Sequence, residues 1–493
     1  MAIETEAAPP AAPARLREID ELPSPPRLPI VGNALQFERA RMHQQVERWA
    51  REYGPYFTFR LGSRRLLVVA DHAAMGALLR DRPDGFRRTK RLAEITAEIG
   101  SAAVGVFGSE GEAWKRQRRM VMAGFDPRHL RAYFSSLVKV SERLAGRWSR
   151  AADAAAPIDL QADLMRYTVD TVSGLAFGAE VNTLESDDDV IQRHLDKIFP
   201  AIFRRIMAPL PTWRYWKTAA DRELDESVAA IGVAIRDFVA AARKRLEDPA
   251  RRAAPQNLLE AMIVAADDPQ SGITPSEIHG NVLTMLLAGE DTTANSLAWT
   301  IWLLYKHPDC LARARAEVDA EVGEPAAWTI ERFARLDYVE ACANETLRLR
   351  PVAPFLMLQA LRDTSIADIR VPAETVIWGA LRADSLRDEH FDEPERFKPE
   401  RWLADAGPSA SSANRVSMPF GAGPRVCPGR HLAMLEIKMA LAVVLGRFDI
   451  ESVAPSSGDE PGEDLAFTMS PEPLTLRLRR RGESQAVASA ASA

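Results

Sequence analysis

The sequence predicts a mainly helical α+β protein, built as a single fold that is rich in helices and contains small β-sheets. Helical periodicity covers most of the chain, and β-rich patterns are confined to two main stretches, 56–71 and 364–379. Strands do not alternate regularly with helices, which argues against a βαβ protein. The 493 residues, 46% hydrophobic and 27% charged, are typical of a globular enzyme.

The first predicted elements are a helix followed by a hairpin. Residues 42–53 carry apolar side chains at helical spacing and are followed by Gly54, a residue suited to a helix C-cap. Residues 56–71 alternate apolar and polar side chains around a Gly62-Ser63 turn. This alternation predicts a β-hairpin.

A long helix is predicted over 275–306. Thr274 and Glu277 form a capping box with Pro275 at the first helical position, and Pro308 bounds the other end. At 1.5 Å per residue the helix is about 48 Å long and must cross the whole molecule. The polar run 290–293 at its middle is therefore expected in the interior, where buried carboxylates indicate chemistry. The alternative is that its threonine hydroxyls merely hydrogen-bond back to helix carbonyls.

Composition limits the remaining possibilities. Residues 1–20 and 481–493 are predicted to be disordered tails that flank a single domain over 21–480. The net charge of −6 argues against a nucleic-acid binder, and three widely spaced cysteines favour a cytoplasmic location. We expect neither a transmembrane anchor nor a signal peptide.

The strongest chemical signal is the segment Phe420–Gly429, in which a glycine-rich loop holds Cys427 just before a helix. The glycines permit tight bends, the helix N-terminus favours a thiolate, and Arg425 suits an anion. A buried structural cysteine is the ordinary alternative. A Rossmann loop lacks its third glycine here, and a zinc site lacks a second ligand at the right spacing. One thiolate with an open opposite side suits haem iron.

This loop resembles the haem-binding loop of the cytochrome P450 family through Phe420, Gly423, Arg425, Cys427 and Gly429. Further landmarks follow in the family's order, and the resemblance covers about residues 23–480. They are the helix motif that contains Ala288, Gly289, Asp291 and Thr292, the pair Glu345 and Arg348, the later Arg396, the pair Trp114 and Arg118, and a proline-rich segment near residue 30.

The resemblance implies a cytochrome P450 fold with haem b between the long central helix and the helix after the cysteine loop. Cys427 would bind the iron, while Asp291 and Thr292 would relay protons during O2 activation. Gly289 would leave room for the porphyrin or O2. The remaining haem neighbours would be Trp114, Arg118, Ala288, Phe420, Gly423, Arg425 and Gly429.

The resemblance also implies that Glu345, Arg348 and Arg396 form a buried structural triad. An ordinary surface ion pair is the alternative. In addition, Leu358 occupies the position where many relatives place an arginine for a haem propionate. The third propionate partner is therefore left open. Segment 350–354 resembles soluble bacterial fatty-acid hydroxylases.

The implied activity is insertion of one oxygen atom of O2 into a hydrophobic substrate. Hydroxylation or epoxidation of a fatty acid, terpenoid, steroid or similar lipid is expected. NAD(P)H-derived electrons would arrive from a ferredoxin, flavodoxin or flavoprotein reductase, because no flavin region follows Cys427. Basic side chains at 115, 116, 119 and 430 would form the surface on which this partner docks. A haem-thiolate sensor without turnover is the alternative, whereas a non-haem hydrolase lacks its motifs. Expected pocket residues are Phe107, Ala288, Phe355, Leu356, Phe467 and Met469.

Overall fold

The computed structural model describes residues 15–99, 105–125, 127–186, 190–404, 413–458 and 460–482. It confirms a mainly helical fold with small sheets. The helices are α1 (Met42–Tyr53), α2 (His72–Arg80), α3 (Lys90–Ile99), α4 (Gly111–Gly124), α5 (Pro127–Asp153), α6 (Leu160–Phe177), α7 (Val190–Leu195), α8 (Ile198–Met207), α9 (Ala219–Arg245), α10 (Pro249–Ala253), α11 (Leu258–Ala266), α12 (Pro275–Lys306), α13 (Pro308–Glu321), α14 (Ile330–Ala334), α15 (Asp337–Leu349) and α17 (Arg430–Arg447). The strands are β1 (Arg17–Glu18), β2 (Tyr56–Leu61), β3 (Arg64–Val69), β4 (Phe86–Arg88), β5 (Ile158–Asp159), β6 (Phe355–Ala360), β7 (Thr364–Ile366), β8 (Ile369–Val371), β9 (Val376–Ala380), β10 (Phe448–Pro455), β11 (Glu463–Leu465), β12 (Met469–Pro471) and β13 (Leu474–Arg480).

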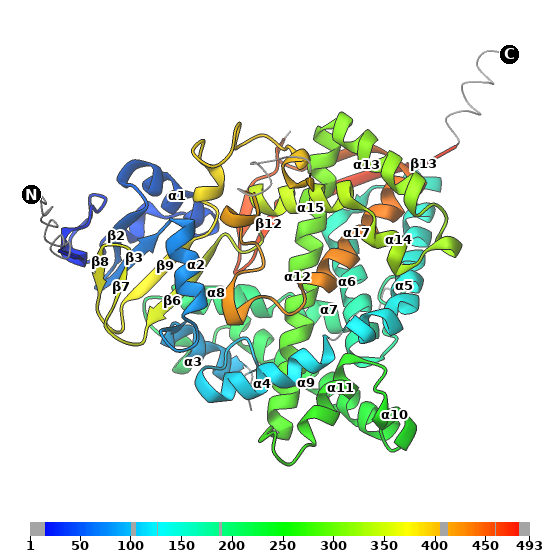
Figure 1. Ribbon diagram of the computed structural model, residues 1–493, viewed down its shortest axis with the longest axis horizontal. Helices are drawn as coiled ribbons and strands as arrows, with labels where there is room; N and C mark the ends of the chain where they lie inside the picture. The colour runs from blue at the N-terminus through cyan, green and yellow to red at the C-terminus, as the bar shows by residue number, and fades with distance from the viewer. Residues whose placement is uncertain are drawn as a thin grey trace, which may run out of the picture.

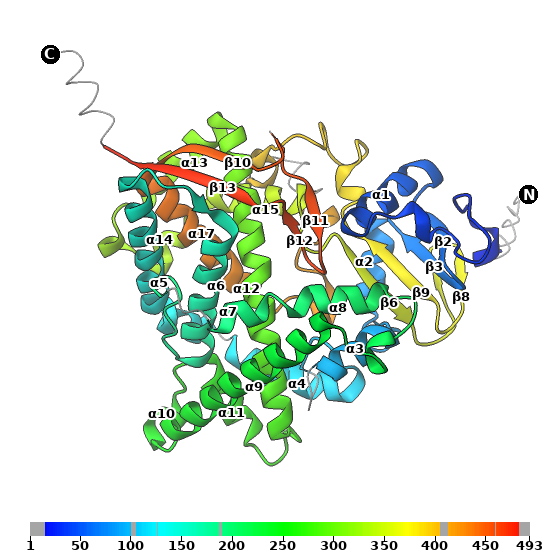
Figure 2. The same ribbon diagram turned by 180° about the vertical axis from the view of Figure 1, so that it is seen from behind.

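The molecule has a helical side and a sheet side. Figures 1 and 2 show most helices gathered around α12, while the sheet of β2, β3, β9 and β6 lies at the other end with α1 and α2. The helix α12 packs against α6, α15 and α17. Its central residues therefore lie between these two sides, where the site is built.

The predicted long helix is confirmed with its capping box. The Thr274 side chain accepts from the backbone N–H of Glu277, and the Glu277 carboxylate accepts from the backbone N–H of Thr274. Every residue from Thr293 to Leu304 is buried, so packing on all sides holds this half of α12 in place. Across the described residues, no helix has the length and the apolar character needed to cross a bilayer.

The largest sheet has the strand order β2-β3-β9-β6-β4. The predicted hairpin is confirmed, with Tyr56 opposite Val69 and the turn at Gly62 and Ser63. The edge strand β4 runs antiparallel to β6, and this register places Arg88 opposite Leu358. With this pairing, Arg88 lies at the wall of the cavity described below.

The N-terminal boundary differs from the prediction. Strand β1 pairs with β8, and the Arg17 guanidinium bonds the Asp368 carboxylate at 2.7 and 2.8 Å. The predicted disordered tail over 1–20 is thus wrong at its end, because β1 pairs through Arg17 and Glu18 and the next residues form the short helix η1 (Ile19–Glu21). Residues 1–14 lie outside the described part, as do 483–493 of the predicted C-terminal tail.

Candidate functional site

The cysteine loop is a tight turn held against α2. The backbone N–H of Cys427 donates to the carbonyl of Phe420 at 2.9 Å, which closes the loop. Gly423 has a φ of +68°, and a Cβ there would lie 2.4 Å from the Leu79 carbonyl oxygen of α2. Both facts require glycine. Gly429 has an ordinary φ of −84° and acts as the N-cap residue of α17.

The environment of Cys427 contains opposing influences on its pKa. Burial raises the pKa of the thiol, whereas the backbone N–H of Gly429 and the charges of Arg118 and Arg430 lower it. Burial is the larger influence, so the pKa of the Cys427 thiol lies above its ordinary value. The expectation that the N–H groups at this helix N-terminus favour a thiolate is confirmed in direction, since the Gly429 N–H lowers the pKa, although burial outweighs it. The groups that lower the pKa would stabilise a thiolate once a metal removes the proton.

The predicted basic residues gather beside this loop. Arg118 donates to the carbonyl of Val426 at 2.8 Å. The guanidinium of Arg425 lies 4.6 Å from the centre of the Trp114 ring and donates to the carbonyl of Ser109 at 2.7 Å. The structure therefore brings Trp114 and Arg118 of α4 together with the cysteine loop.

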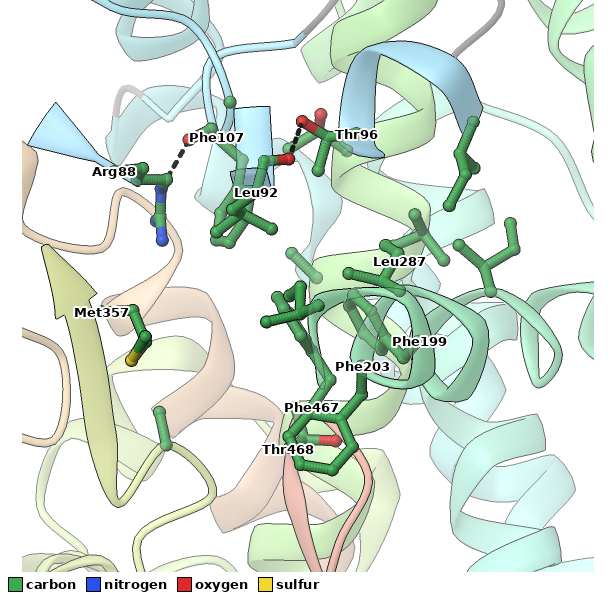
Figure 3. Close-up of a pocket in the computed structure, with 18 of the residues that line it drawn as sticks. Arg88, Leu92, Thr96, Phe107, Phe199, Phe203, Leu287, Met357, Phe467 and Thr468 are labelled. Carbon is green, nitrogen blue, oxygen red and sulfur yellow. Dashed lines mark hydrogen bonds between the residues drawn. The ribbon is translucent and has the colours of Figure 1, made fainter. Parts of the chain in front are cut away.

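Two further arginines join them that sequence analysis did not single out. Arg88 donates from Nε to the carbonyl of Phe107 at 2.8 Å, and its guanidinium lies 3.5 Å from the centre of that ring (Figure 3). Arg82 is 4% exposed, and its Nε and Nη2 have no hydrogen-bond partner among the described residues. In the sequence, the adjacent basic residues at 87 and 88 are a weak indication of an anion-binding role for Arg88.

The arginine cluster, defined as Arg82, Arg88, Arg118 and Arg425, carries an excess of positive charge. Burial lowers the pKa of all four side chains, that of Arg425 to about 10. Among the described residues, Glu110 is the carboxylate that raises the pKa of Arg82, Arg88 and Arg425. Buried guanidinium groups with unused N–H donors need an anionic partner. The two propionates of a haem meet this requirement, so the residues fit that cofactor.

The central turn of α12 forms the wall of a cavity. Ala288 is exposed although it lies at mid-helix, and Thr292 lines the same cavity. The Thr292 hydroxyl donates to the Ala288 carbonyl at 2.7 Å, which is the back-bonding that the sequence analysis kept as an alternative. In this state the hydroxyl is at the cavity but uses its proton within the helix.

Gly289 has a role other than the predicted one. A Cβ at this position would lie 2.4 Å from Cγ2 of Val172 on α6. The glycine therefore permits close packing of α6 against α12. The expectation that Gly289 leaves room for the porphyrin is wrong, since its free side faces a helix and Ala288 faces the cavity.

Asp291 is held by two side chains. Its carboxylate accepts from Nδ2 of Asn295 at 2.8 Å and from the hydroxyl of Thr468, next to β12. Burial raises the pKa of Asp291, and these two hydrogen bonds lower it. Thr468 also lines the cavity, so this acid is connected to the cavity wall through a residue that the sequence pattern did not indicate.

Removing the Thr468 hydroxyl should change the titration of Asp291. In Thr468→Val the carboxylate loses a hydrogen bond that favours its ionised form, so the pKa of Asp291 should rise further. Any pH-dependent step that needs ionised Asp291 should then move to higher pH. Infrared difference spectra, with Asp291→Asn to assign the carboxyl band, measure this. A titration that is unchanged or moves to lower pH contradicts the assignment.

The predicted triad is correct in two of its three members. Glu345 and Arg348 are fully buried and form a two-bond ion pair, with both distances at 2.8 Å. Arg396, however, is 64% exposed and pairs with Glu393, so its prediction is wrong. The third member is Arg401, whose Nε lies 3.3 Å from the Glu345 carboxylate.

The cavity is mainly apolar and has a volume of about 250 Å³. Figure 3 shows Phe107, Phe199, Phe203 and Phe467 among its walls. The predicted pocket residues Phe107, Ala288, Phe355, Leu356 and Phe467 all line it. Met469 does not, because β12 buries it completely in a core cluster beside Arg382.

The basic docking patch is only partly free. Lys115 pairs with Glu112 at 2.8 Å, and Arg116 pairs with Glu277 at 2.7 Å. Arg119 and Arg430 are exposed. Two of the four basic side chains thus remain as exposed candidates.

A family model described as "Cytochrome P450" matches residues 22–478. The chain is similar to Protein LUTEIN DEFICIENT 5, chloroplastic, of Arabidopsis thaliana, with 26% identity over 87% of this chain and 72% of that protein. Thromboxane-A synthase of Sus scrofa is 27% identical over 86% of this chain and 85% of its own length. The self-sufficient cytochrome P450 monooxygenase CYP505E1 of Aspergillus niger is 27% identical over 94% of this chain, which spans only 42% of that relative.

Among solved structures, the crystal structure of the cytochrome P450DA heme domain superposes with a TM-score of 0.80. It is 24% identical and covers 95% of this chain and 98% of its own, which supports the fold. The three protein relatives come from a plant, a mammal and a fungus. The resemblance to soluble bacterial members therefore stays a prediction.

Proposed function

The chain belongs to the cytochrome P450 family, and on that premise we propose that it is a haem-thiolate monooxygenase that oxidises a hydrophobic lipid-like substrate. The observation that carries the proposal is the buried arginine cluster beside Cys427. Its unused N–H donors and excess charge match the carboxylates of a haem. The apolar cavity that Ala288 and Thr292 line supports binding of an apolar substrate near the same place.

We assign the haem b contacts as follows. Cys427 would bind the iron, and the arginine cluster would hold the propionates. Arg88 lies opposite Leu358 in the β4–β6 register and so supplies the positive charge that position 358 lacks. When bound, the haem would supply activation of O2, which a thiolate ligand promotes by donating electron density. Ala288 has a small side chain, so α12 can lie close to the cofactor.

The proton steps are assigned to Asp291 and Thr292. Burial raises the pKa of Asp291, which brings this carboxyl closer to a range in which it exchanges protons with solvent. Thr292 offers a hydroxyl at the cavity wall. For this hydroxyl to donate into the cavity, its bond to the Ala288 carbonyl must break, which a side-chain rotation achieves.

Asp291→Asn and Thr292→Ala should both impair turnover while leaving the cofactor bound. We expect Asp291→Asn to lower the rate of product formation on the order of 100-fold, as for other positioned proton donors. Thr292→Ala should lower the amount of product per NAD(P)H consumed. Coupled assays of NAD(P)H and product measure both.

Thr300→Ala is the matched control for Thr292→Ala. Thr300 lies on the same helix and makes the same bond to a preceding carbonyl, at 2.7 Å to Ser296, but it is fully buried away from the cavity. Its variant should keep wild-type coupling. Unchanged coupling in Thr292→Ala, or an equal loss in Thr300→Ala, argues against the relay.

The substrate and the electron donor are proposed at the level of class. The aromatic and aliphatic cavity walls favour a fatty acid, terpenoid, steroid or similar lipid. A ferredoxin, flavodoxin or flavoprotein reductase is the proposed donor, and exposed Arg119 and Arg430 would favour an acidic partner. The cytoplasmic location rests on cysteine content alone.

Reconstitution with surrogate partners tests the whole proposal. The holoprotein is titrated with a library of lipids and terpenoids, and substrates that change its haem spectrum are incubated with NAD(P)H and ¹⁸O₂. One labelled oxygen atom in the product supports a monooxygenase. Tight ligand binding without NAD(P)H consumption with any donor supports the sensor alternative instead.

A further inference from the structure

Three metal-ligating side chains meet outside the cavity, at the start of α2. His72 is the first residue of α2, Asp384 begins the short helix η6 (Asp384–Leu386), and His390 follows that helix. The Nδ1 of His72 lies 2.7 Å from Oδ2 of Asp384, and Nε2 of His390 lies 3.5 Å from the same oxygen. One potential ligand atom from each residue lies within 4.8 Å of the other two.

These distances are close to those around a bound ion. Zn²⁺ binds imidazole nitrogen and carboxylate oxygen at about 2.0–2.2 Å in a tetrahedral arrangement, so its ligand atoms lie roughly 3.3–3.6 Å apart. Modest side-chain rotations bring the three groups into that range. The side chains of His72 and His390 are 14% and 18% exposed, so an ion and a completing water can enter from solvent.

The surroundings hold the carboxylate in place and do not fill the site. Oδ2 of Asp384 accepts from the backbone N–H of His72 at 2.8 Å, which fixes its orientation. Arg387 lies 3.7 Å from Oδ1 of Asp384, which is the carboxylate oxygen that does not contact the imidazoles. The same guanidinium also pairs with Glu389 at 2.8 Å. Asp71, the N-cap residue of α2, adds a further negative charge nearby.

We propose that His72, Asp384 and His390 form a binding site for a divalent transition-metal ion, with Zn²⁺ as the ion of choice. Two neutral imidazoles and one carboxylate, without a thiolate, form a ligand set that zinc accepts, with water as the fourth ligand. None of these three residues belongs to the arginine cluster, the cysteine loop or the cavity wall.

The position of the site gives the ion a structural role. The other end of α2 supports the cysteine loop, since a Cβ at Gly423 would meet the Leu79 carbonyl at 2.4 Å and Cα of Arg80 at 2.8 Å. Figure 1 shows α2 beside the orange segment that carries this loop. An ion that joins the start of α2 to residues 384–390 therefore strengthens the support of Cys427.

Zinc titration of the full-chain holoprotein tests the site. After treatment with EDTA, which removes adventitious metal, calorimetric titration with zinc chloride should give one equivalent, and zinc should raise the midpoint of thermal unfolding. His72→Gln and His390→Gln should each lower the zinc affinity on the order of 100-fold. X-ray absorption at the zinc edge, which haem iron does not obscure, should show two imidazole ligands plus oxygen.

His279→Gln is the matched control, because His279 is a half-buried imidazole whose Nδ1 lies 2.7 Å from a carbonyl of its own helix. This variant should bind zinc as the wild type does. The proposal is overturned by a wild type that binds no zinc, or by unchanged affinity in both His72→Gln and His390→Gln. The carbon monoxide spectrum of each variant reports an intact cysteine loop. If His72→Gln, at the start of α2, loses haem, His390→Gln alone decides the result.

Discussion

Replacing Cys427 with serine should abolish the long-wavelength Soret band of the reduced, carbon monoxide-bound protein, together with all product formation. A serine hydroxyl stays protonated where a thiol can be deprotonated by the metal, so the variant loses the electron-rich axial ligand. The loop itself should persist, because the hydrogen bond that closes it joins the backbone of residue 427 to the Phe420 carbonyl. Difference spectra of the reduced protein and product assays measure the two effects.

Cys310→Ser provides the matched control for this substitution. Cys310 is a half-buried free cysteine on α13, and burial raises the pKa of its thiol as it does for Cys427. It lacks a glycine loop and a neighbouring arginine cluster, so its replacement should leave the band and the activity intact. A wild type without the band, or a Cys427→Ser protein that keeps it, contradicts the assignment of the iron ligand.

Local signals explain why the main helices could be predicted from the sequence. The bounds of α12 follow from Thr274, Pro275 and Glu277, which interact within one turn. The end of α1 follows from Gly54, whose φ of +89° other residues rarely adopt. In each case the residues that determine the helix boundary lie within a few positions of one another, so the local sequence is enough to predict it.

Other features depend on contacts between distant segments. The role of Gly289 follows from Val172 on another helix, and the role of Arg88 follows from a strand register that places it opposite Leu358. Nothing near residue 468 in the sequence indicates that its hydroxyl reaches Asp291. These relations appear only when the chain folds, which is why the sequence indicated the haem loop but not the full set of groups around it.

The third member of the buried triad shows the same limit within a short segment. Arg396 and Arg401 lie five positions apart, and the family pattern favoured the first. Between them the chain turns at Pro399, so that Arg401 points inward to Glu345 while Arg396 points to solvent and offers its carbonyl to Arg348 at 3.4 Å. Spacing alone cannot tell which of two nearby guanidinium groups a turn buries.

Glu345→Gln should destabilise the protein strongly. The carboxylate of Glu345 accepts hydrogen bonds from Arg348, Arg401, the backbone N–H of Lys398 and the indole of Trp402. Its replacement leaves two buried guanidinium groups without a counter-charge, for which a loss of about 3–5 kcal/mol in the free energy of unfolding is expected. Urea unfolding of the holoprotein, monitored through the haem band, measures this loss.

Arg401→Met and Arg396→Met separate the observed triad from the predicted one. Arg401 is 3% exposed and also donates to the Glu393 carbonyl at 2.8 Å, so its replacement removes one positive charge from the triad and takes a donor from that part-buried carbonyl. A loss of about 2–4 kcal/mol is expected. Arg396 makes an exposed ion pair, for which about 0–1 kcal/mol is expected. Equal losses in the two variants, or a larger loss for Arg396→Met, would contradict the assignment of Arg401 as the third member of the triad. Both variants replace an arginine with methionine in the same segment. The difference between their losses in the free energy of unfolding therefore reports the burial of the charged group and not the type of substitution.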